Sequence, residues 1–275
     1  MNIVTTTSVF PPCYSQKQTI MRLKACGFRH LDLALDYCVQ EDDFPFVTPA
    51  WREWAMDLAA FAKEQGVQYT HAHAEGDVTV HTDRMIRGFE VCRILGISYM
   101  VIHPVYRDEN GQYVHNAEQF ISMNAQAVRP LLAHAERTGV VILSENLLRG
   151  ASIPPSVIAE LVERVNSPWF GWCYDTGHAN AFDITADVLI GLKHPPRSLH
   201  MQDNHGFCKD EHLLPGDGTI DWNRFLEVLH VIGYKGDLVL EAHHQSLEAP
   251  DEEREAILSD LYARAASMKR IFASL

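Results

Sequence analysis

The sequence predicts an α/β protein whose residues 1–275 form one domain, a (β/α)8 TIM barrel. The first observation is an alternation of eight short β-type runs with eight amphipathic helical stretches. Strict alternation of this kind is typical of a parallel sheet with helical crossovers. The second is the length, because α/β barrels of roughly 200–250 residues commonly form one domain. The third is that no low-complexity run or Ser/Gly-rich linker marks a domain boundary.

The expected strands are short and rich in β-branched and apolar residues, which favour a buried sheet. In order along the chain they cover residues 3–7, 30–35, 67–73, 98–103, 140–145, 169–175, 198–202 and 238–241. A doubly wound open sheet is the alternative architecture. Such a sheet usually carries a glycine-rich phosphate loop after its first strand. Residues 7–12 read Thr-Ser-Val-Phe-Pro-Pro and contain no such loop.

The expected helices follow the strands at residues 17–26, 51–65, 79–95, 117–138, 155–165, 184–192, 221–232 and 250–274. Glycines stand between five of these helices and the next strand, at Gly27, Gly66, Gly96, Gly139 and Gly233. A left-handed glycine is favoured at that place. Pro130 predicts a kink in the fourth helix, because proline removes a backbone hydrogen bond. The last helix has acidic residues in its first turn and Lys269 and Arg270 near its end, which matches the helix dipole.

Composition and charge exclude several classes of function. The chain has 23 Lys and Arg against 36 Asp and Glu, a formal net charge of −13. This charge counts against nucleic acid as a partner, because basic side chains are needed to neutralise phosphates. No run reaches the ~18–20 apolar residues that cross a membrane, and the first residues lack the features of a secretion signal. The six cysteines form no Cys-x-x-Cys pair, which favours reduced thiols and a cytoplasmic location. The sequence is also compatible with assembly into a homo-oligomer.

Six successive strands end in a residue that can bind a metal ion. These residues are His73, His103, Glu145, Asp175, His200 and Glu241, and His178 follows Asp175 by three positions. The carboxyl ends of barrel strands converge on one rim, so we expect these side chains to meet there. Carboxylates among imidazoles suit divalent ions such as manganese, zinc, cobalt or iron(II). Burying the carboxylates together without a cation would be costly. The sequence therefore predicts a site for one or more divalent metal ions.

Each of these residues also has an ordinary structural interpretation. A strand-end carboxylate often caps the next helix, and a lone buried histidine is more often a hydrogen-bonded core residue. Capping does not explain six successive strands, so metal binding is the preferred interpretation for Glu145, Asp175, His200 and Glu241. His71 is expected to face elsewhere or to support the site. The histidines expected at the surface or in packing are His30, His81, His115, His134, His194 and His230.

A long segment after the seventh strand lacks periodicity. It runs from Gln202 to Gly218 and includes Lys209. A loop of this length inside a compact domain is usually functional. Asp210 and His212, spaced Asp-x-His, could ligate a further metal ion or contact substrate.

At these residues the chain resembles the xylose isomerase-like TIM-barrel superfamily. This superfamily includes sugar and sugar-phosphate isomerases and epimerases, inosose dehydratase-like enzymes and endonuclease IV-type AP endonucleases (AP endonuclease family 2). The resemblance covers nearly the whole chain. Its most specific motifs are residues 144–146 (Ser-Glu-Asn), 175–178 (Asp-Thr-Gly-His), 199–203 (Leu-His-Met-Gln-Asp) and 215–222 (Pro-Gly-Asp-Gly-Thr-Ile-Asp-Trp).

The resemblance implies metal ligands in two branches. In the epimerase and isomerase branch, one catalytic metal ion is implied at Glu145, Asp175, His200 and Glu241, with His178 in contact with substrate oxygen. The AP-endonuclease branch uses the same positions and adds ligands that correspond to His73, His103, His178, Asp210 and His212. The arginine that small ketose epimerases carry shortly after the position of His200 is absent, because residues 203–206 read Asp-Asn-His-Gly.

The leading hypothesis is metal-dependent proton transfer next to a carbonyl of a small sugar or sugar phosphate. Glu145 and Glu241 would act as base and acid, and His178 would hydrogen-bond the oxygen on which charge develops. Asp32 and Lys209 are candidates for contacts with substrate hydroxyl or phosphate groups. The alternatives are phosphodiester hydrolysis at abasic DNA sites by a trinuclear zinc cluster, an inosose or dehydroshikimate-type dehydratase, and a non-catalytic binding barrel. The net charge ranks sugar above DNA.

Overall fold

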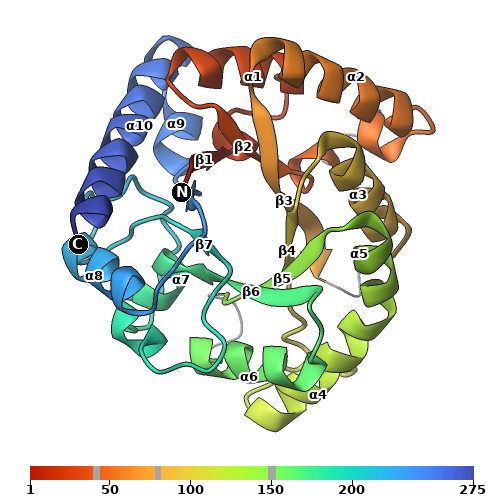
Figure 1. The fold of residues 1–275 in the computed structure, drawn as a ribbon, viewed down its shortest axis with the longest axis vertical. Coiled ribbons are helices and arrows are strands. Elements are labelled where there is room, and N and C mark those ends of the chain that lie inside the picture. Colours follow the sequence, from red (N-terminus) through yellow and green to blue (C-terminus); the bar gives the residue numbers. More distant parts are fainter. Residues whose placement is uncertain (40–43, 78–81, 148–152) are drawn as a thin grey trace.

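Eight parallel strands form one barrel in a computed structural model that describes residues 1–39, 44–77, 82–147 and 153–275. The strand order is β7-β6-β5-β4-β3-β2-β1-β8, and helices surround the barrel (Figure 1). The strands are β1 (Ile3–Thr6), β2 (His30–Ala34), β3 (Gln68–Asp77), β4 (Tyr99–His103), β5 (Val141–Glu145), β6 (Phe170–Asp175), β7 (Ser198–His200) and β8 (Leu238–Leu240). The predicted (β/α)8 barrel is confirmed, and the open sheet is excluded.

The barrel closes between β7 and β8, which meet around one parallel bridge, Met201 with Leu240. The amide of Met201 donates to the carbonyl of Val239 at 2.7 Å, and the amide of Glu241 donates to the carbonyl of Met201 at 3.0 Å. Both strands have only 3 residues. His200 and Glu241 therefore lie on the two sides of the seam where the barrel closes.

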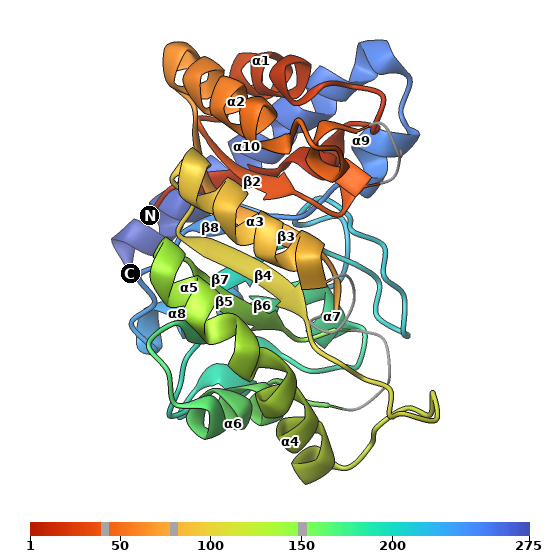
Figure 2. The same ribbon diagram turned by 90° about the vertical axis from the view of Figure 1, so that its right-hand side faces the viewer.

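Helices cover the outside of the barrel (Figure 2). They are α1 (Gln16–Ala25), α2 (Trp51–Gln65), α3 (Thr82–Leu95), α4 (Ala117–Val128), α5 (Leu132–Thr138), α6 (Pro155–Val165), α7 (Thr176–Asn180), α8 (Trp222–Val231), α9 (His244–Glu248) and α10 (Asp251–Ser274). Short 3-10 turns are η1 (Thr7–Val9), η2 (Tyr37–Val39), η3 (Pro45–Val47), η4 (Arg129–Leu131) and η5 (Ala186–Leu189).

Local sequence signals explain several of these boundaries. The α1 helix begins with a capping box, in which the Ser15 side chain accepts from the amide of Gln18. The α2 and α5 helices end at the left-handed residues Gly66 and Gly139, with φ of 67° and 73°, as the sequence predicts. Pro130 lies in the η4 turn that separates α4 from α5, so the expected kink is confirmed.

The prediction of a helix over residues 184–192 is wrong. Only the 3-10 turn η5 forms there. The α-helix after β6 is instead the short α7, which begins directly after the strand because the Asp175 carboxylate accepts from the amide of His178. Asp183 then adopts a left-handed backbone with φ of 57°, which a helix of L-residues cannot continue through. The short helix α9 was not expected either.

Apolar side chains fill two separate regions. The main core lies between the strands and the helices, and a smaller cluster of Val101, Leu143 and Cys173 lies inside the barrel. Because side chains alternate along a strand, the inward-facing residues two positions further along these strands are His103, Glu145 and Asp175. The barrel interior therefore changes from apolar to polar towards the carboxyl ends of the strands.

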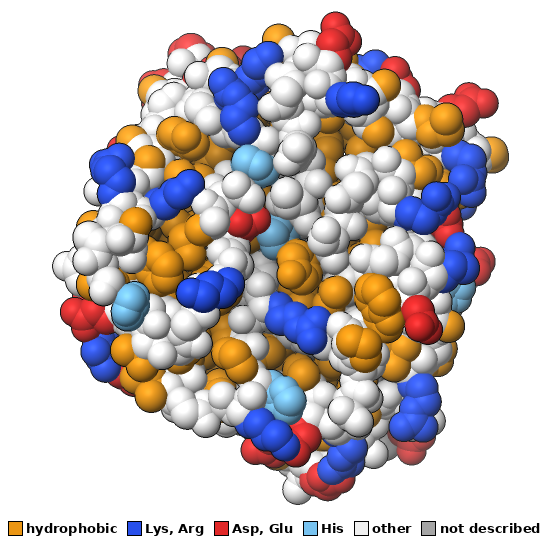
Figure 3. Space-filling view, in the orientation of Figure 1, with side chains coloured by type: hydrophobic (Ala, Val, Ile, Leu, Met, Phe, Trp, Pro, Cys, Tyr) orange, Lys and Arg blue, Asp and Glu red, His pale blue; other side chains and the backbone are white. Residues whose placement is uncertain are grey.

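The two ends of the barrel differ. Both chain termini lie at the end where the strands begin, and α7 and α9 lie towards the opposite end (Figure 2). The first of these faces carries Lys and Arg side chains that are separated by neutral and apolar surface (Figure 3). Within the described ranges, no helix is long and apolar enough to cross a membrane.

Candidate metal centre

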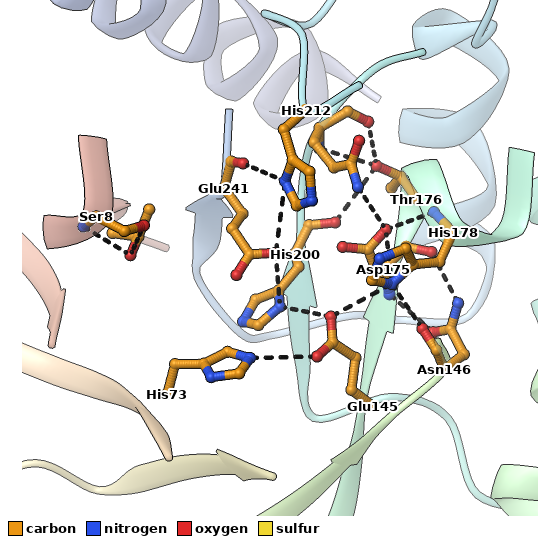
Figure 4. Close-up of polar contacts among 12 residues, drawn as sticks. Ser8, His73, Glu145, Asn146, Asp175, Thr176, His178, His200, His212 and Glu241 are labelled. Atoms are coloured by element: carbon orange, nitrogen blue, oxygen red, sulfur yellow. Dashed lines mark hydrogen bonds and ion pairs between the residues drawn. The ribbon is translucent and has the colours of Figure 1, made fainter. Parts of the chain in front are cut away.

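The six strand-end residues singled out in the sequence meet at the carboxyl end of the barrel, and Figure 4 shows His73, Glu145, Asp175, His200 and Glu241 there. Glu145, at the end of β5, lies in the middle of this cluster. Its Oε1 is 2.8 Å from Nδ1 of His200, and its Oε2 is 3.4 Å from Nε2 of His73 and 3.4 Å from Nε2 of His103. Nδ1 of His200 is also 3.2 Å from Oε2 of Glu241. The expected convergence of β3, β4, β5, β7 and β8 is therefore present in the structure.

Asp175 joins this cluster from the end of β6. Its Oδ1 caps α7 by accepting from the amide of His178 at 2.6 Å, so both interpretations of a strand-end carboxylate apply to it. Its backbone is fixed by Asn146, whose side chain accepts from the Asp175 amide and donates to the Asp175 carbonyl. The second oxygen, Oδ2, is buried and has no hydrogen-bond partner, so it is free to bind a cation.

His178 connects this cluster to the loop after β7. Its Nδ1 lies 2.9 Å from the carbonyl oxygen of Asn146, and its Nε2 lies 3.4 Å from Oδ1 of Asp210. The same Asp210 oxygen is 3.0 Å from Nε2 of His212. Nδ1 of His212 in turn lies 2.8 Å from the carbonyl oxygen of Glu241. The Asp-x-His pair of the loop thus faces the strand-end residues.

Asp203 holds the loop in this position. Its carboxylate accepts from the amide of Gly216 and from the indole of Trp222, both at 2.8 Å. The loop also packs tightly at Gly218, where a Cβ would lie 2.3 Å from the carbonyl oxygen of Asn204. The motif over residues 215–222 therefore has a structural role, because it anchors the loop that carries Asp210 and His212.

Among the described residues, these side chains form four groups that could each hold a metal ion, and three of the groups share residues. In each group, one ligand atom per residue lies within 4.8 Å of the others. The groups are His73, His103 and Glu145; His73, His200 and Glu241; His178, Asp210 and His212; and Glu145, Asp175, His200 and Glu241. Neutral imidazoles combined with carboxylates suit zinc, manganese or cobalt. The donor set and the unpartnered Oδ2 of Asp175 both fit a divalent ion.

Burial and neighbouring charges shift the pKa values in opposite directions. Burial alone would raise the pKa of Glu145, but the surrounding imidazoles hold it well below its usual range. Burial raises the pKa of Asp175 to about 7. Burial opposes the protonation of His73 and His178, yet the nearby carboxylates raise the pKa of each to about 10. Without metal, protonated imidazoles therefore supply the positive charge that balances the carboxylates.

Comparison with known proteins agrees with this geometry. Residues 20–261 match the sequence family described as xylose isomerase-like TIM barrel. The chain belongs to this family. Curated relatives include the uncharacterized protein MJ1311 of Methanocaldococcus jannaschii, 32% identical over 152 residues, and the uncharacterized protein y4fM of Sinorhizobium fredii, 28% identical over 155 residues. These matches cover 52% and 55% of this chain, and 50% and 49% of the relatives, so the chain spans about half of their length.

Several solved structures share the fold along almost the whole chain. A zinc-bound IolI protein has a TM-score of 0.78 at 19% identity, with 97% of this chain and 98% of that chain covered. A D-psicose 3-epimerase has a TM-score of 0.75 at 13% identity, with 98% and 99% covered. The 3-keto-D-glucoside 4-epimerase YcjR from E. coli has a TM-score of 0.72 at 19% identity, with 96% and 99% covered.

Asp32 and Lys209, the two residues suggested as substrate contacts, lie away from the centre of the candidate metal site. A cavity of about 180 Å³ opens onto the site and is lined by Asp36, His73, His103, Glu145, Leu147, His178, Asp210, His212, Glu241 and His243. Asp32 is absent from this lining and lies fully buried inside the barrel. Lys209 is exposed on the loop after β7 and does not line the cavity either.

Two cavity residues were missed in the sequence, Asp36 and His243. His243 stacks on His212 with ring centroids 4.1 Å apart, and its buried Nδ1 has no partner. Asp36 and His243 follow Asp32 and Glu241 by an even number of residues. Because strand side chains alternate, this even spacing was the available signal for a common inward direction.

The remaining histidines lie outside the cavity lining. His71 stacks on Tyr99, with ring centroids 5.2 Å apart, and contacts Thr70. Burial lowers the pKa of His71 to about 4, so this imidazole is neutral. Of the histidines predicted at the surface or in packing, His30, His115, His134, His194 and His230 are exposed or half-buried, and His205 and His244 are exposed as well. His81 lies outside the described residues.

Proposed function

We propose that the protein is a divalent-metal-dependent isomerase or epimerase that moves a proton next to a carbonyl of a small sugar or sugar phosphate. One observation carries this proposal. Two carboxylates on different strands, Glu145 and Glu241, approach the same nitrogen of His200 at 2.8 and 3.2 Å. A pair of this kind can flank one carbon, and the structural neighbours that are named as sugar epimerases support the assignment.

The proposed metal ligands are Glu145, Asp175, His200 and Glu241. A bound manganese, zinc or cobalt ion would act as a Lewis acid that polarises a substrate carbonyl. We infer one or more ions per chain, because further donor groups adjoin this set.

The chain's own residues supply the proton chemistry. The pKa values of Glu145 and Glu241 are held below their usual range, against the effect of burial, by the neighbouring imidazoles. Both side chains are therefore carboxylates that can accept a proton from a substrate carbon. His178 is protonated at neutral pH, because carboxylates raise its pKa to about 10 despite burial. Its imidazolium can donate a hydrogen bond to the oxygen on which negative charge develops.

Proton exchange with solvent tests this proposal. The metal-loaded protein is incubated in deuterated water with candidate ketoses and ketose phosphates, and deuterium at the carbon next to the carbonyl is measured by NMR. We expect incorporation by the wild type and at least a 100-fold slower rate for Glu145→Gln and Glu241→Gln, a typical loss for a missing acid or base. Glu118→Gln, on the exposed side of α4, is the matched control. Unchanged exchange in both site variants would refute the assigned roles.

A second candidate function follows from a separate observation. His178, Asp210 and His212 form a donor group next to the first set, as do His73, His103 and Glu145. Several metal ions at these groups would suit phosphodiester hydrolysis at abasic DNA sites. Metal analysis distinguishes the two candidates, because one ion per chain favours the isomerase and three favour the nuclease. Cleavage of an abasic duplex would reverse the ranking, and release of water from an inosose would instead indicate the dehydratase.

A further inference from the structure

Inward-facing side chains are stacked in layers below the proposed metal site. In a barrel of eight parallel strands, alternate strands contribute four side chains to each layer. The strand register places Thr6, His73, Glu145 and His200, all on odd-numbered strands, in one layer. The even-numbered strands supply the layer beneath it, which consists of Asp32, Val101, Cys173 and Val239. Asp32 is the single carboxylate of this lower layer.

Asp32 has no hydrogen-bond partner among the described residues. Its side chain is 0% exposed, and both of its carboxylate oxygens are buried without a donor. A buried carboxylate without partners is destabilising, and each such group in a folded protein calls for an explanation. The proposed acid–base chemistry does not use Asp32, because it does not line the cavity.

His200, in the layer directly above, has an unpartnered ring nitrogen that could donate a hydrogen bond. Its Nδ1 faces Glu145 and Glu241, whereas its Nε2 is buried without a partner. Figure 4 shows the contacts of this ring on one nitrogen only. His73, the other imidazole of that layer, has both nitrogens engaged, Nδ1 with the carbonyl of Ala74 and Nε2 with Glu145. Among the buried ring nitrogens of the described residues that lack a partner, Nε2 of His200 is the one that belongs to the layer next to Asp32.

We propose that Asp32 is a positioning residue for the metal centre. The side chains of Asp32 and His200 are not in direct contact, so a buried water that accepts the Nε2–H of His200 and donates to the Asp32 carboxylate would connect them and fix the tautomer that leaves the Nδ1 lone pair free for a metal ion. Histidines that bind metals generally donate their other N–H to a carboxylate, a carbonyl or a water, and loss of that partner typically lowers metal affinity by about 10–100-fold. The inference rests on the proposed metal site and not on the reaction.

The competing partner for Nε2 is the thiol of Cys173, which belongs to the same layer as Asp32. The thiol is close enough to raise the pKa of His200 against the effect of burial, but it is a weak hydrogen-bond acceptor, and Nε2 of His200 has no partner that meets ordinary distance and angle limits. A carboxylate in the same layer is the stronger acceptor, which favours Asp32 as the residue that orients His200.

The test compares metal affinity with stability in the same variants. Metal-free wild type and Asp32→Asn are titrated with manganese or cobalt by calorimetry, and thermal unfolding is followed without metal. We expect Asp32→Asn to bind metal about 10–100-fold more weakly and to be at least as heat-stable as wild type, because a buried charge is removed. The absorption spectrum of bound cobalt should change too, since the orientation of one ligand changes.

Two control variants separate this role from general damage. Cys173→Ala tests the competing partner. Ser144→Ala removes another buried, unpartnered oxygen next to Glu145, on the outward side of β5. Both should bind metal as wild type does. Metal affinity equal to that of wild type in Asp32→Asn, and in Asp32→Ser as a second variant, would overturn this inference but leave the proposed metal site standing. A wild type that binds no metal would overturn the proposed site, and the inference with it.

Discussion

The carboxylate of Glu145 lies among four imidazoles, and this arrangement determines the charge state of the metal-free site. Its oxygens are 2.8 to 3.6 Å from ring nitrogens of His73, His103, His178 and His200. Against the effect of burial, the carboxylates raise the pKa values of His73, His178 and His200, so these three pairs stabilise the metal-free fold below the usual pKa of histidine, and their contribution is lost as the pH rises through the raised values. An ion bound by the proposed ligands must displace the proton on the ligand nitrogen of His200 before it can bind.

Metal binding should therefore release protons at neutral pH. The pKa values of His73 and His178 are raised to about 10 and that of His212 to about 9, in each case by carboxylates against the effect of burial. At about pH 7.5 these imidazoles carry protons, as does His200, whose pKa is raised well above its usual value, and a metal ion at the proposed ligands must displace the proton of His200. Calorimetric titrations in two buffers of different ionisation enthalpy should give different heats, and affinity should weaken as the pH falls. Equal heats in both buffers would contradict this charge state.

At the scale of elements, the loop after β7 depends on close backbone packing. Its carboxylate anchor is Asp203, and its tightest approach is at Gly218, where an added Cβ would lie 2.3 Å from the carbonyl oxygen of Asn204. That backbone atom cannot move aside as a flexible side chain could. The position of Asp210 and His212 relative to the strand ends therefore depends on the absence of a side chain at Gly218.

Gly218→Ala should destabilise the protein by about 1–3 kcal/mol, the usual effect of overpacking. It should also weaken binding at the group that contains Asp210 and His212. Urea unfolding and metal titration measure the two effects. Gly88→Ala in α3 is the matched control, because a Cβ there makes ordinary contacts of 3.4 Å and alanine favours a helix. Equal stability of the two variants would show that the loop tolerates the extra atom.

At the scale of the whole molecule, the proposed metal ligands come from strands distributed around the barrel. Glu145, Asp175, His200 and Glu241 belong to or follow four different strands, and no two of them are close in sequence. These four side chains come together only in the folded barrel, so an ion bound by all four binds the folded state and not the unfolded one. Its binding energy therefore adds to the stability of the whole barrel.

Divalent metal should accordingly raise the melting temperature. At about 100 times the dissociation constant the gain is about 2.7 kcal/mol, which corresponds to about 5–10 °C for a chain of this size. Differential scanning calorimetry with manganese or zinc, followed by a chelator, measures the shift and its reversal. Asp175→Asn should lose most of the shift. A melting temperature that does not respond to any of these ions would count against a resident metal.

The architecture was predictable because it depends on patterns that repeat along the chain. Alternating strand and helix signals gave the barrel, and the strand-end positions gave the cluster around Glu145, because parallel strands bring their carboxyl ends together. The helix expected over residues 184–192 failed because Asp175 caps an earlier helix and Asp183 is left-handed. Asp36 and His243 lie just beyond the ends of their strands, where composition alone gives no direction.

The closing seam between β7 and β8 has a consequence for the order of events in folding. His200 and Glu241 lie on its two sides, and the two short strands meet around a single bridge. During synthesis, Glu145, Asp175 and His200 emerge before the last strand exists, so the complete donor set becomes available only when that strand docks. Capture of the proposed metal ion would therefore be a late event that requires a finished barrel, because a partly made chain does not yet present the full set of proposed ligands.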